Sequence, residues 1–304
     1  MEMILPPACA LCGKNEFQPV ATEQIEGKIL GIQKCSSCGL HFVWPRLDNH
    51  QEPYKAFTEE SFNKKYGAIS RGERLHDRHQ NYLEEVELVR TYAKKDAHVL
   101  DVGCNAGWLL GYLKNANFAI EGVEPSNILA DIAHRRTGAV IHNCYLHEVQ
   151  DRDGAFDCIM ATDVIEHITP ENINQFIVSM YRLLKPGGRV IIKTPNVKYT
   201  YAKYLCIRVI PVALRKHFLK AMDLWNAKEH VLQWDDVTLS SMFKKHQLEP
   251  VAIFVPKPIE TKNTPIIPRT LRKVIYAAAQ LWKGSQHIPW FAQDICLIAE
   301  RKVE

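Results

Sequence analysis

The feature that most constrains the fold is a regular alternation of short apolar strands and helical segments between residues 98 and 193. Predicted strands at 98–102, 119–124, 139–141, 156–161 and 189–193 alternate with predicted helices at 107–115, 126–136 and 171–184. A helix at 73–94 precedes this region, and a helix at 237–246 and strands at 251–255 and 294–299 follow it. Strands separated by helices predict an α/β fold with a parallel, doubly wound sheet.

The composition describes an ordinary globular chain. Of 304 residues, 46% are apolar and 24% are charged, and the net charge of +4 is too small to argue for nucleic acid by itself. The first residues lack a basic segment followed by a long apolar stretch, and no run reaches the roughly eighteen apolar residues of a membrane span. We therefore expect a cytoplasmic protein without a signal peptide.

Four of the nine cysteines form two close pairs near the N-terminus. Cys9 and Cys12 precede Gly13, and Cys35 and Cys38 precede Gly39. A two-residue gap lets both thiolates of a pair reach one tetrahedral ion, and the following glycine permits a left-handed turn that aims backbone N–H groups at sulfur. The spacing predicts one structural zinc ion bound by Cys9, Cys12, Cys35 and Cys38. The alternatives are four unrelated cysteines or a redox pair, which lacks a thioredoxin-like context here.

The other five cysteines (Cys104, Cys144, Cys158, Cys206 and Cys296) stand singly in the sequence and are expected to be small buried apolar residues. The chain divides into a zinc-knuckle domain at 1–45, a helical linker or cap at 46–95, and a catalytic domain at 96–304 with an insertion at 197–228.

A glycine loop follows the first predicted strand of the catalytic domain. Asp101 ends this strand, and Gly103 and Gly107 lie in the loop before the next helix. The middle glycine of the dinucleotide fingerprint is missing, which argues against NAD or FAD. Glu124 ends the second strand, where a carboxylate can accept hydrogen bonds from ribose hydroxyls.

Together, these segments and two later ones resemble the class I S-adenosylmethionine-dependent methyltransferases. The resemblance rests on Asp101-Val-Gly-Cys-Asn-Ala-Gly107, Gly122-Val-Glu-Pro-Ser126, Phe156-Asp-Cys-Ile159 with Asp163-Val-Ile-Glu-His167, and Leu184-Lys-Pro-Gly-Gly188. It covers roughly residues 95–300. It implies a Rossmann-like, seven-stranded sheet whose last strand is antiparallel, and S-adenosylmethionine as the cofactor.

The resemblance also assigns cofactor contacts. Asp101, Gly103 and Gly107 would contact the amino-acid end of the cofactor, and Glu124 would hold the ribose. Asn143 and Cys144 would lie near adenine, although the acidic residue often found there is absent. The complete expected set is Asp101, Gly103, Cys104, Asn105, Gly107, Trp108, Glu124, Asn143, Cys144 and Thr162.

A polar cluster is expected where the methyl acceptor binds. Methyl transfer from a sulfonium requires an acceptor held in line and, for an alcohol, removal of its proton. Asp163, Glu166 and His167 leave the fourth strand together and share one face of a helical turn, and His230 follows the insertion. These four residues are the predicted catalytic set. The structural alternatives are that Glu166 and His167 only cap the loop and that His230 is a core residue.

This layout resembles the O-methyltransferases of ubiquinone biosynthesis and those that methylate a ribose hydroxyl at small-RNA ends. Both groups can use an acidic-x-x-Glu-His turn and a distant histidine to hold a divalent ion, here Mg²⁺ or Mn²⁺. Asp163 replaces the first glutamate, which shortens the reach to a metal. Without an ion, His167 or His230 would act as general base.

The insertion is basic and aromatic. Between 197 and 222 it contains six lysines and arginines and no acid (Lys198, Lys203, Arg208, Arg215, Lys216 and Lys220). We expect this insertion to cover the acceptor site. Its basic and aromatic side chains suit an anionic or lipid-linked small molecule, or contact with an anionic membrane surface. The alternative is an amphipathic lid helix with a solvated basic face.

The chain segment from Cys35 to Pro45, placed ahead of such a domain, resembles a bacterial arrangement that modifies sugars and other small metabolites for polysaccharides and natural products. The expected function is methyl transfer to a hydroxyl of such a metabolite. The competing functions are an RNA methyltransferase that uses the knuckle and the basic insertion, and a non-catalytic zinc- and cofactor-binding module. No RNA-binding module is evident beyond the knuckle. The sequence leaves the oligomeric state open.

Overall fold

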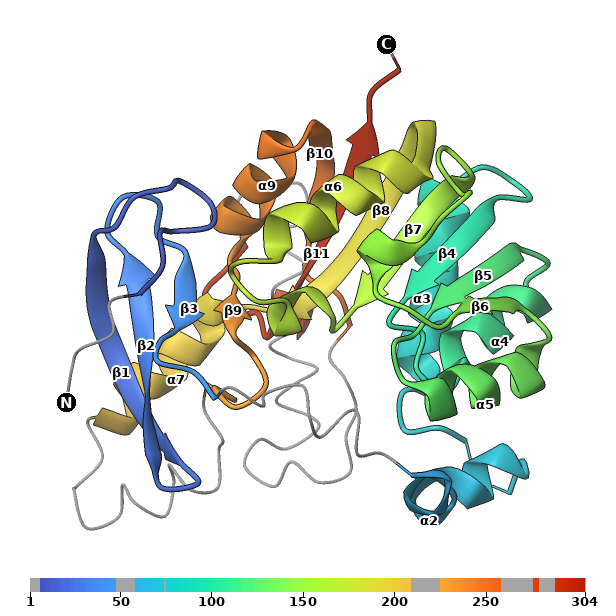
Figure 1. Cartoon of the computed structure of the whole chain (residues 1–304), viewed down its shortest axis with the longest axis horizontal. Coiled ribbons are helices and arrows are strands. Elements are labelled where there is room, and N and C mark those ends of the chain that lie inside the picture. Colours follow the sequence, from blue (N-terminus) through green and yellow to red (C-terminus); the bar gives the residue numbers. More distant parts are fainter. Residues whose placement is uncertain are drawn as a thin grey trace.

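A seven-stranded sheet forms the centre of the molecule (Figure 1), in the order β10-β11-β8-β7-β4-β5-β6. The computed structural model describes residues 6–47, 58–73, 75–208, 225–257, 276–278 and 288–303. Neighbouring strands from β6 to β8 pair in parallel, whereas β11 is antiparallel to both β8 and β10. The strands are β4 (His98–Val102), β5 (Ala119–Val123), β6 (Val140–His142), β7 (Phe156–Thr162), β8 (Leu184–Pro195), β10 (Leu248–Phe254) and β11 (Asp294–Arg301). The predicted doubly wound sheet with an antiparallel last strand is confirmed.

Helices cover both faces of this sheet because successive strand residues point to opposite sides. On one face, Cys158 and Met160 of β7 share a buried cluster with the helices α3 (His79–Tyr92) and α4 (Trp108–Asn115). On the other face, Ile159 and Ala161 share a cluster with α6 (Ile173–Leu183) and α9 (Asp236–Lys245). The helix α5 (Asn127–Thr137) joins β5 to β6, and 3₁₀ turns η1 (Leu146–Glu148) and η2 (Ile165–His167) flank β7.

A second, four-stranded sheet lies beside the first and is antiparallel throughout, in the order β1-β2-β3-β9. The strands β1 (Phe17–Ile25) and β2 (Lys28–Cys35) form a hairpin whose two turn residues, Glu26 and Gly27, both have positive φ. The next strand is β3 (His41–Val43), and the fourth is β9 (Leu232–Gln233), from far along the chain. The N-terminal sheet is therefore completed by a strand that follows the insertion.

The helical region before β4 differs from its prediction. A helix α2 (Glu59–Ser70) is followed by a turn, and α3 begins at His79 and not at Glu73. His76 Nδ1 accepts a hydrogen bond from the backbone N–H of Arg78, which holds the chain in the turn. The remaining predicted helices and strands of the catalytic domain are present, with ends shifted by a few residues.

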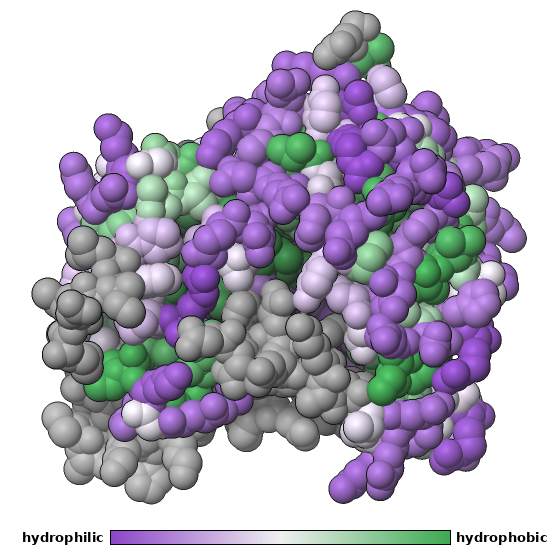
Figure 2. All heavy atoms as spheres, viewed as in Figure 1, coloured by the Kyte–Doolittle hydropathy of each residue, from purple (hydrophilic) through white to green (hydrophobic). Residues whose placement is uncertain are grey.

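The insertion begins as α7 (Val197–Arg208). Residues 209–224, with Arg215, Lys216 and Lys220, lie outside the described residues. Among the helices that the structure describes, none has the length and apolar character of a membrane-spanning segment. Polar side chains cover most of the described part of the face in Figure 2.

Candidate active site

The glycine loop lies at the carboxyl ends of β4 and β5. Gly103 and Gly107 have φ values of 70° and 72°, a left-handed conformation that favours glycine. The backbone N–H groups of Gly103 and Cys104 both donate to the carbonyl of Val123, at 2.8 and 3.1 Å. This bond pair ties the loop to the end of the neighbouring strand, where doubly wound folds bind nucleotides.

Glu124 holds the same loop through hydrogen bonds to backbone N–H groups. Its carboxylate is fully buried and accepts hydrogen bonds from the backbone N–H groups of Asn105 at 2.9 Å and Ser126 at 2.8 Å. The Asn143 amide donates to the Glu124 carbonyl at 2.8 Å. Three residues of the predicted cofactor set, Asn105, Glu124 and Asn143, are therefore linked by hydrogen bonds at the end of β5.

Asp101 is a buried acid that suits a cationic ligand. Burial, and then the negative charges of Glu85 and Glu124, raise the pKa of Asp101 well above its ordinary value, while Arg78 opposes the shift. A positive group beside this side chain would favour its ionised form. The ammonium and sulfonium groups of S-adenosylmethionine provide such charge, so the residue fits the expected cofactor.

The other predicted cofactor residues have mixed surroundings. Thr162 Oγ1 and Trp108 Nε1 are buried and have no hydrogen-bond partner in the described part of the chain, so two polar groups are left for a ligand. The Trp108 ring is covered by the Arg136 guanidinium, 3.3 Å from its centroid. The Cys104 thiol packs into a small core with Leu110, so Cys104 would contact a cofactor through its backbone. Burial raises the pKa of the Cys144 thiol.

The turn η2 joins the glycine loop to the predicted catalytic residues. A Cβ atom added to Gly103 would lie 2.8 Å from Cγ2 of Val164, immediately before this turn. The glycine loop and the turn are thus in direct contact. Glu166 and His167 belong to η2, so their side chains start next to the cofactor loop.

Three of the four predicted catalytic residues come together. Ligand atoms of Glu166, His167 and His230 all lie within 4.8 Å of one another, and the two imidazole rings meet edge to face at 4.9 Å. His167 Nδ1 bonds to the carbonyl of Glu229 at 3.0 Å, so this nitrogen is the donor and Nε2 has the free lone pair. Residues from either side of the insertion thus form one site.

The environment of this cluster sets its charge. Burial, and then the charge of Asp163, raise the pKa of Glu166 well above its ordinary value. Burial lowers the pKa of His167, and burial with the neighbouring His167 lowers the pKa of His230 to about 4. Both imidazoles are therefore neutral near pH 7 and can accept a proton or bind a metal ion.

Asp163 does not join the cluster, contrary to the sequence prediction. Its backbone has a positive φ of 54°, and its carboxylate forms an ion pair with Arg78 at 2.8 Å. The turn is a short 3₁₀ helix and not an α-helical turn, so the predicted common face with Glu166 does not form. Asp163 instead belongs to a buried ionic network.

That network was not predicted from the sequence. Arg78 also lies 3.6 Å from Glu85, whose carboxylate is 3.1 Å from the Lys193 ammonium. Lys193 and Glu85 are completely or almost completely buried, on β8 and α3 respectively. The network connects the helical cap to the turn that leads into η2. Its partners are far apart in the chain, so no local pattern could reveal it.

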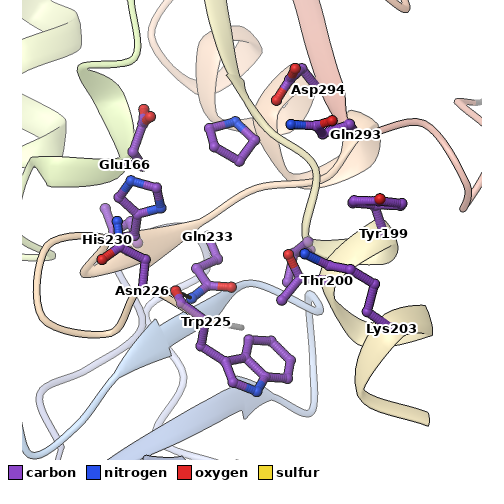
Figure 3. Close-up of a pocket in the computed structure, with 13 residues that line it drawn as sticks. Glu166, Tyr199, Thr200, Lys203, Trp225, Asn226, His230, Gln233, Gln293 and Asp294 are labelled. Atoms are coloured by element: carbon purple, nitrogen blue, oxygen red, sulfur yellow. Dashed lines mark hydrogen bonds between the residues drawn. The ribbon is translucent and has the colours of Figure 1, made fainter. Parts of the chain in front are cut away.

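A cavity of about 170 Å³ opens beside the cluster (Figure 3). Glu166 and His230 line one side, and Gln293 and Asp294, which open β11, line another. The described lining residues are mainly polar, and they come from η2, α7, the segment around β9 and the start of β11: Glu166, Pro195, Val197, Tyr199, Thr200, Lys203, Trp225, Asn226, His230, Leu232, Gln233, Gln293 and Asp294.

Six of the lining residues belong to the predicted insertion, whereas five others were missed in the sequence: Pro195, Leu232, Gln233, Gln293 and Asp294. Asp294 is the first residue of the predicted buried strand 294–299, and an acid in that place is a usable signal. Burial, and then the charge of Asp163, raise the pKa of Asp294 to about 7. Gln233 had no local signal, since it lines the cavity only because β9 joins the N-terminal sheet.

The four N-terminal cysteines come together, as the predicted metal site requires. Cys9 and Cys38 sulfurs lie 3.5 Å apart, as do those of Cys12 and Cys35, and all four sulfurs lie within 4.8 Å of one another. A tetrahedral zinc ion with Zn–S bonds of about 2.3 Å requires sulfurs about 3.8 Å apart. The cysteine geometry therefore fits zinc.

The knuckle backbone supports thiolate ligands. Gly13 and Gly39 have positive φ values of 72° and 83° and donate to the carbonyls of Cys9 and Cys35. Burial opposes ionisation of Cys35, but backbone hydrogen bonds from Cys38 and Ser37 outweigh it and lower the pKa to about 7. For Cys9 and Cys38 burial dominates and raises the pKa, so a bound cation would be needed to keep these two thiols ionised. The glycine turns thus aim N–H groups at sulfur, as the spacing predicts.

The loop geometry agrees with a comparison of sequences. A family model described as "Methyltransferase domain" matches residues 74–253, more than half of the chain. The chain belongs to this methyltransferase family. The class I S-adenosylmethionine-dependent methyltransferase family that the motifs resemble is thereby confirmed, together with its Rossmann-like fold.

Curated relatives of this methyltransferase include ubiquinone biosynthesis O-methyltransferases. That of Bradyrhizobium sp. (strain ORS 278) is 33% identical over 102 residues, which are 32% of this chain and 40% of the relative. That of Rickettsia conorii is 35% identical over 103 residues, 32% of this chain and 35% of the relative. The matches thus span two fifths or less of these relatives' length.

Solved structures share the fold at low identity. The 1,6-didemethyltoxoflavin-N1-methyltransferase of Burkholderia thailandensis, bound to S-adenosylhomocysteine, aligns with a TM-score of 0.51 and 13% identity, over 93% of this chain and 99% of that one. The geranyl diphosphate C-methyltransferase of Streptomyces coelicolor aligns with a TM-score of 0.50 and 15% identity, over 84% and 99%. At this identity the likeness concerns the fold alone.

Proposed function

We propose that this protein transfers a methyl group from S-adenosylmethionine to a hydroxyl of a small metabolite, of the sugar or lipid-linked precursor class. The observation that carries the proposal is the cluster of Glu166, His167 and His230, which opens onto a cavity and adjoins the glycine loop through Val164. This arrangement supports a reaction in which a cofactor at the loop meets an acceptor in the cavity.

Bound S-adenosylmethionine would supply an electrophilic methyl carbon on a sulfonium. His230 lines the cavity and is neutral near pH 7, so a ring nitrogen can take the hydroxyl proton as the acceptor oxygen forms its bond to carbon. The carbon–sulfur bond breaks in the same step and leaves S-adenosylhomocysteine. Glu166, held by Thr194 at 2.9 Å, can orient the hydroxyl through its other oxygen.

His230→Ala tests this role. The variant should lower kcat by about 10²–10⁴ if the imidazole accepts the proton, while S-adenosylmethionine binds unchanged. The measurement is S-adenosylhomocysteine release over a screen of sugars, nucleotide sugars and lipid diphosphates, with calorimetry for cofactor affinity. His134→Ala, an exposed histidine on α5, is the matched control. Normal turnover of the His230 variant on the accepted substrate would exclude this mechanism.

A more specific version of the proposal is that the catalytic cluster binds a divalent ion next to the acceptor hydroxyl. Glu166, His167 and His230 offer one carboxylate and two imidazoles, and the bond from His167 to the Glu229 carbonyl would orient its Nε2 toward an ion. Imidazole ligands suit Mn²⁺ better than Mg²⁺. Mn²⁺ should bind the wild type and not His167→Ala in an electron paramagnetic resonance titration, with cysteine-bound zinc retained. Equal Mn²⁺ binding by both proteins argues against the ion.

Lys203 supports an anionic acceptor. Among the described residues that line the cavity, Lys203 is the lysine, and no arginine is present. Its ammonium lies 4.8 Å from the centre of the Tyr199 ring. A phosphate or diphosphate on the acceptor would be attracted to this rim. Lys203→Ala should raise the KM of a charged acceptor more than that of its uncharged analogue.

We also propose that the segment 197–222 contacts an anionic membrane surface when the acceptor is lipid-linked.

A further inference from the structure

Asp294 is a buried acid at the cavity that neither the motifs nor the catalytic cluster uses. It is the first residue of β11 and is 6% exposed. Its Oδ2 atom has no hydrogen-bond partner in the described part of the chain. In Figure 3 it lies with Gln293 across the cavity from His230.

A second carboxylate at the same cavity, that of Glu166, also has an oxygen without a hydrogen-bond partner in the described part of the chain. Glu166 is 2% exposed, and its Oε1 atom has no partner among the described residues, although its other oxygen accepts from Thr194. Buried carboxylate oxygens without donors are rare in native proteins because leaving them unpaired is unfavourable. Two of them on one cavity indicate a ligand that brings two hydrogen-bond donors.

The rest of the lining favours hydroxyl donors on a saturated ring. Asn226, Gln233 and Gln293 present side-chain amides, which can both donate to and accept from hydroxyl groups. Trp225 adds a broad apolar wall. A small number of placed polar groups around an apolar wall is the usual way in which a pocket fixes the orientation of a ligand.

We propose that Asp294 is a specificity-determining residue that accepts a hydrogen bond from a second hydroxyl of the methyl acceptor, which is a polyhydroxylated saturated ring such as a hexose. Glu166 serves the hydroxyl nearer the catalytic cluster. The inference rests on the proposed function, since it concerns the acceptor of that reaction. A site built to hydrogen-bond a hydroxyl discriminates strongly against an analogue that lacks it.

Binding without turnover tests the inference. Protein saturated with S-adenosylhomocysteine is titrated by calorimetry with a panel of methyl hexosides and uridine diphosphate hexoses, their monodeoxy analogues, and catechol. The wild type should bind at least one hexose more tightly than one of its deoxy analogues. Asp294→Ala, which removes both acceptor oxygens, should weaken the hexose by about tenfold to a hundredfold and leave that deoxy analogue unchanged. Binding of catechol alone, or of no hexose, would overturn the proposal.

Two further measurements separate this role from a structural one. Because Oδ2 lacks a partner in the described part of the chain, Asp294→Ala should change the melting temperature little, whereas Asp157→Ala, which removes the acceptor for the His98 N–H and the Lys185 ammonium, should lower it. A large loss of stability in Asp294→Ala with unchanged hexose binding would assign the residue to structure. Hexose binding that depends on Asp294 without S-adenosylhomocysteine release from S-adenosylmethionine would instead contradict the proposed reaction.

Discussion

At the residue scale, the Glu124 carboxylate holds the glycine loop. It accepts hydrogen bonds from the backbone N–H groups of Asn105 and Ser126, and the family resemblance predicts that it also binds the cofactor ribose. Because the carboxylate is already bonded to the loop, the loop has its shape before a cofactor binds. Preorganisation of this kind lowers the entropic cost of binding.

Removal of this carboxylate should weaken cofactor binding. Glu124→Ala loses hydrogen bonds to a charged acceptor, worth about 1.5–3 kcal/mol, so the affinity for S-adenosylmethionine should fall about tenfold to a hundredfold. Calorimetry measures the change. Glu121→Ala is the control, since Glu121 lies on β5, just before Glu124, but pairs with His142 and Arg152. Unchanged affinity of the Glu124 variant, or tighter binding of NAD, would refute the assignment.

His41 should make the fold sensitive to acid. Burial, and then the charge of Lys34, lower its pKa to about 4, although Asp235 opposes the shift. As the pH falls through the unfolded value of about 6.5, the unfolded chain gains a proton that the folded chain refuses. The free energy of unfolding should therefore fall by about 3 kcal/mol between pH 6.5 and pH 4, and then level off.

Urea unfolding at several pH values measures this effect. His41→Phe should remove most of that decline, whereas near pH 7.5 its stability should stay close to that of the wild type because the wild-type imidazole is neutral there in both states. An identical decline in the variant would show that other groups cause the acid sensitivity.

At the element scale, β9 links the metal site to the acceptor cavity. Leu232 and Gln233 of β9 pair with Phe42 and His41 of β3, and the Val43 N–H donates to the Val231 carbonyl at 3.0 Å. The strand β3 begins three residues after Cys38, one of the four clustered cysteines, and both β9 residues line the cavity. The N-terminal sheet thus forms one wall of the proposed acceptor cavity through its strand β9.

Loss of zinc should loosen this wall and spare the cofactor site. Cys12→Ser removes an exposed ligand, so it disturbs packing little. Elemental analysis should give about one zinc per wild-type chain and none in the variant. Hydrogen exchange of peptides that contain β3 and β9 should rise at least about tenfold, with unchanged S-adenosylmethionine affinity. Cys206→Ser, also exposed, is the control. Full protection of β9 in metal-free protein would contradict the link.

At the scale of the whole molecule, the buried network of Lys193, Glu85 and Arg78 joins the helical cap to the central sheet. Lys193→Met should destabilise the fold by about 3–5 kcal/mol, because Glu85 would lose its closest counter-charge while buried. Adding Glu85→Leu should restore much of the loss, since an apolar pair needs no partner. Urea unfolding compares them, with the exposed Arg90→Ala as control. A double variant as unstable as the single one would argue against this coupling.

The sequence by itself determined the order of strands and helices, the glycine loop and the paired cysteines. Each depends on residues close in the chain: period-two and period-3.6 apolar patterns, glycines at positive φ, and a two-residue spacing between ligands. The fold class and the family followed from these local patterns and are confirmed. Of the predicted catalytic residues, three are brought together as expected.

Only the tertiary structure decided which distant groups meet. Asp163 pairs with Arg78, from a turn before the catalytic domain, at 2.8 Å and is not part of the group that Glu166, His167 and His230 form. The strand β9 joins the N-terminal sheet because β3 has a free edge, and this pairing places Gln233 at the cavity. Asp294 lines the same cavity as Glu166 because β11 pairs with β8, whose last residue, Pro195, also lines it. Such contacts depend on long-range packing and charge pairing, which leave no periodic trace in the chain.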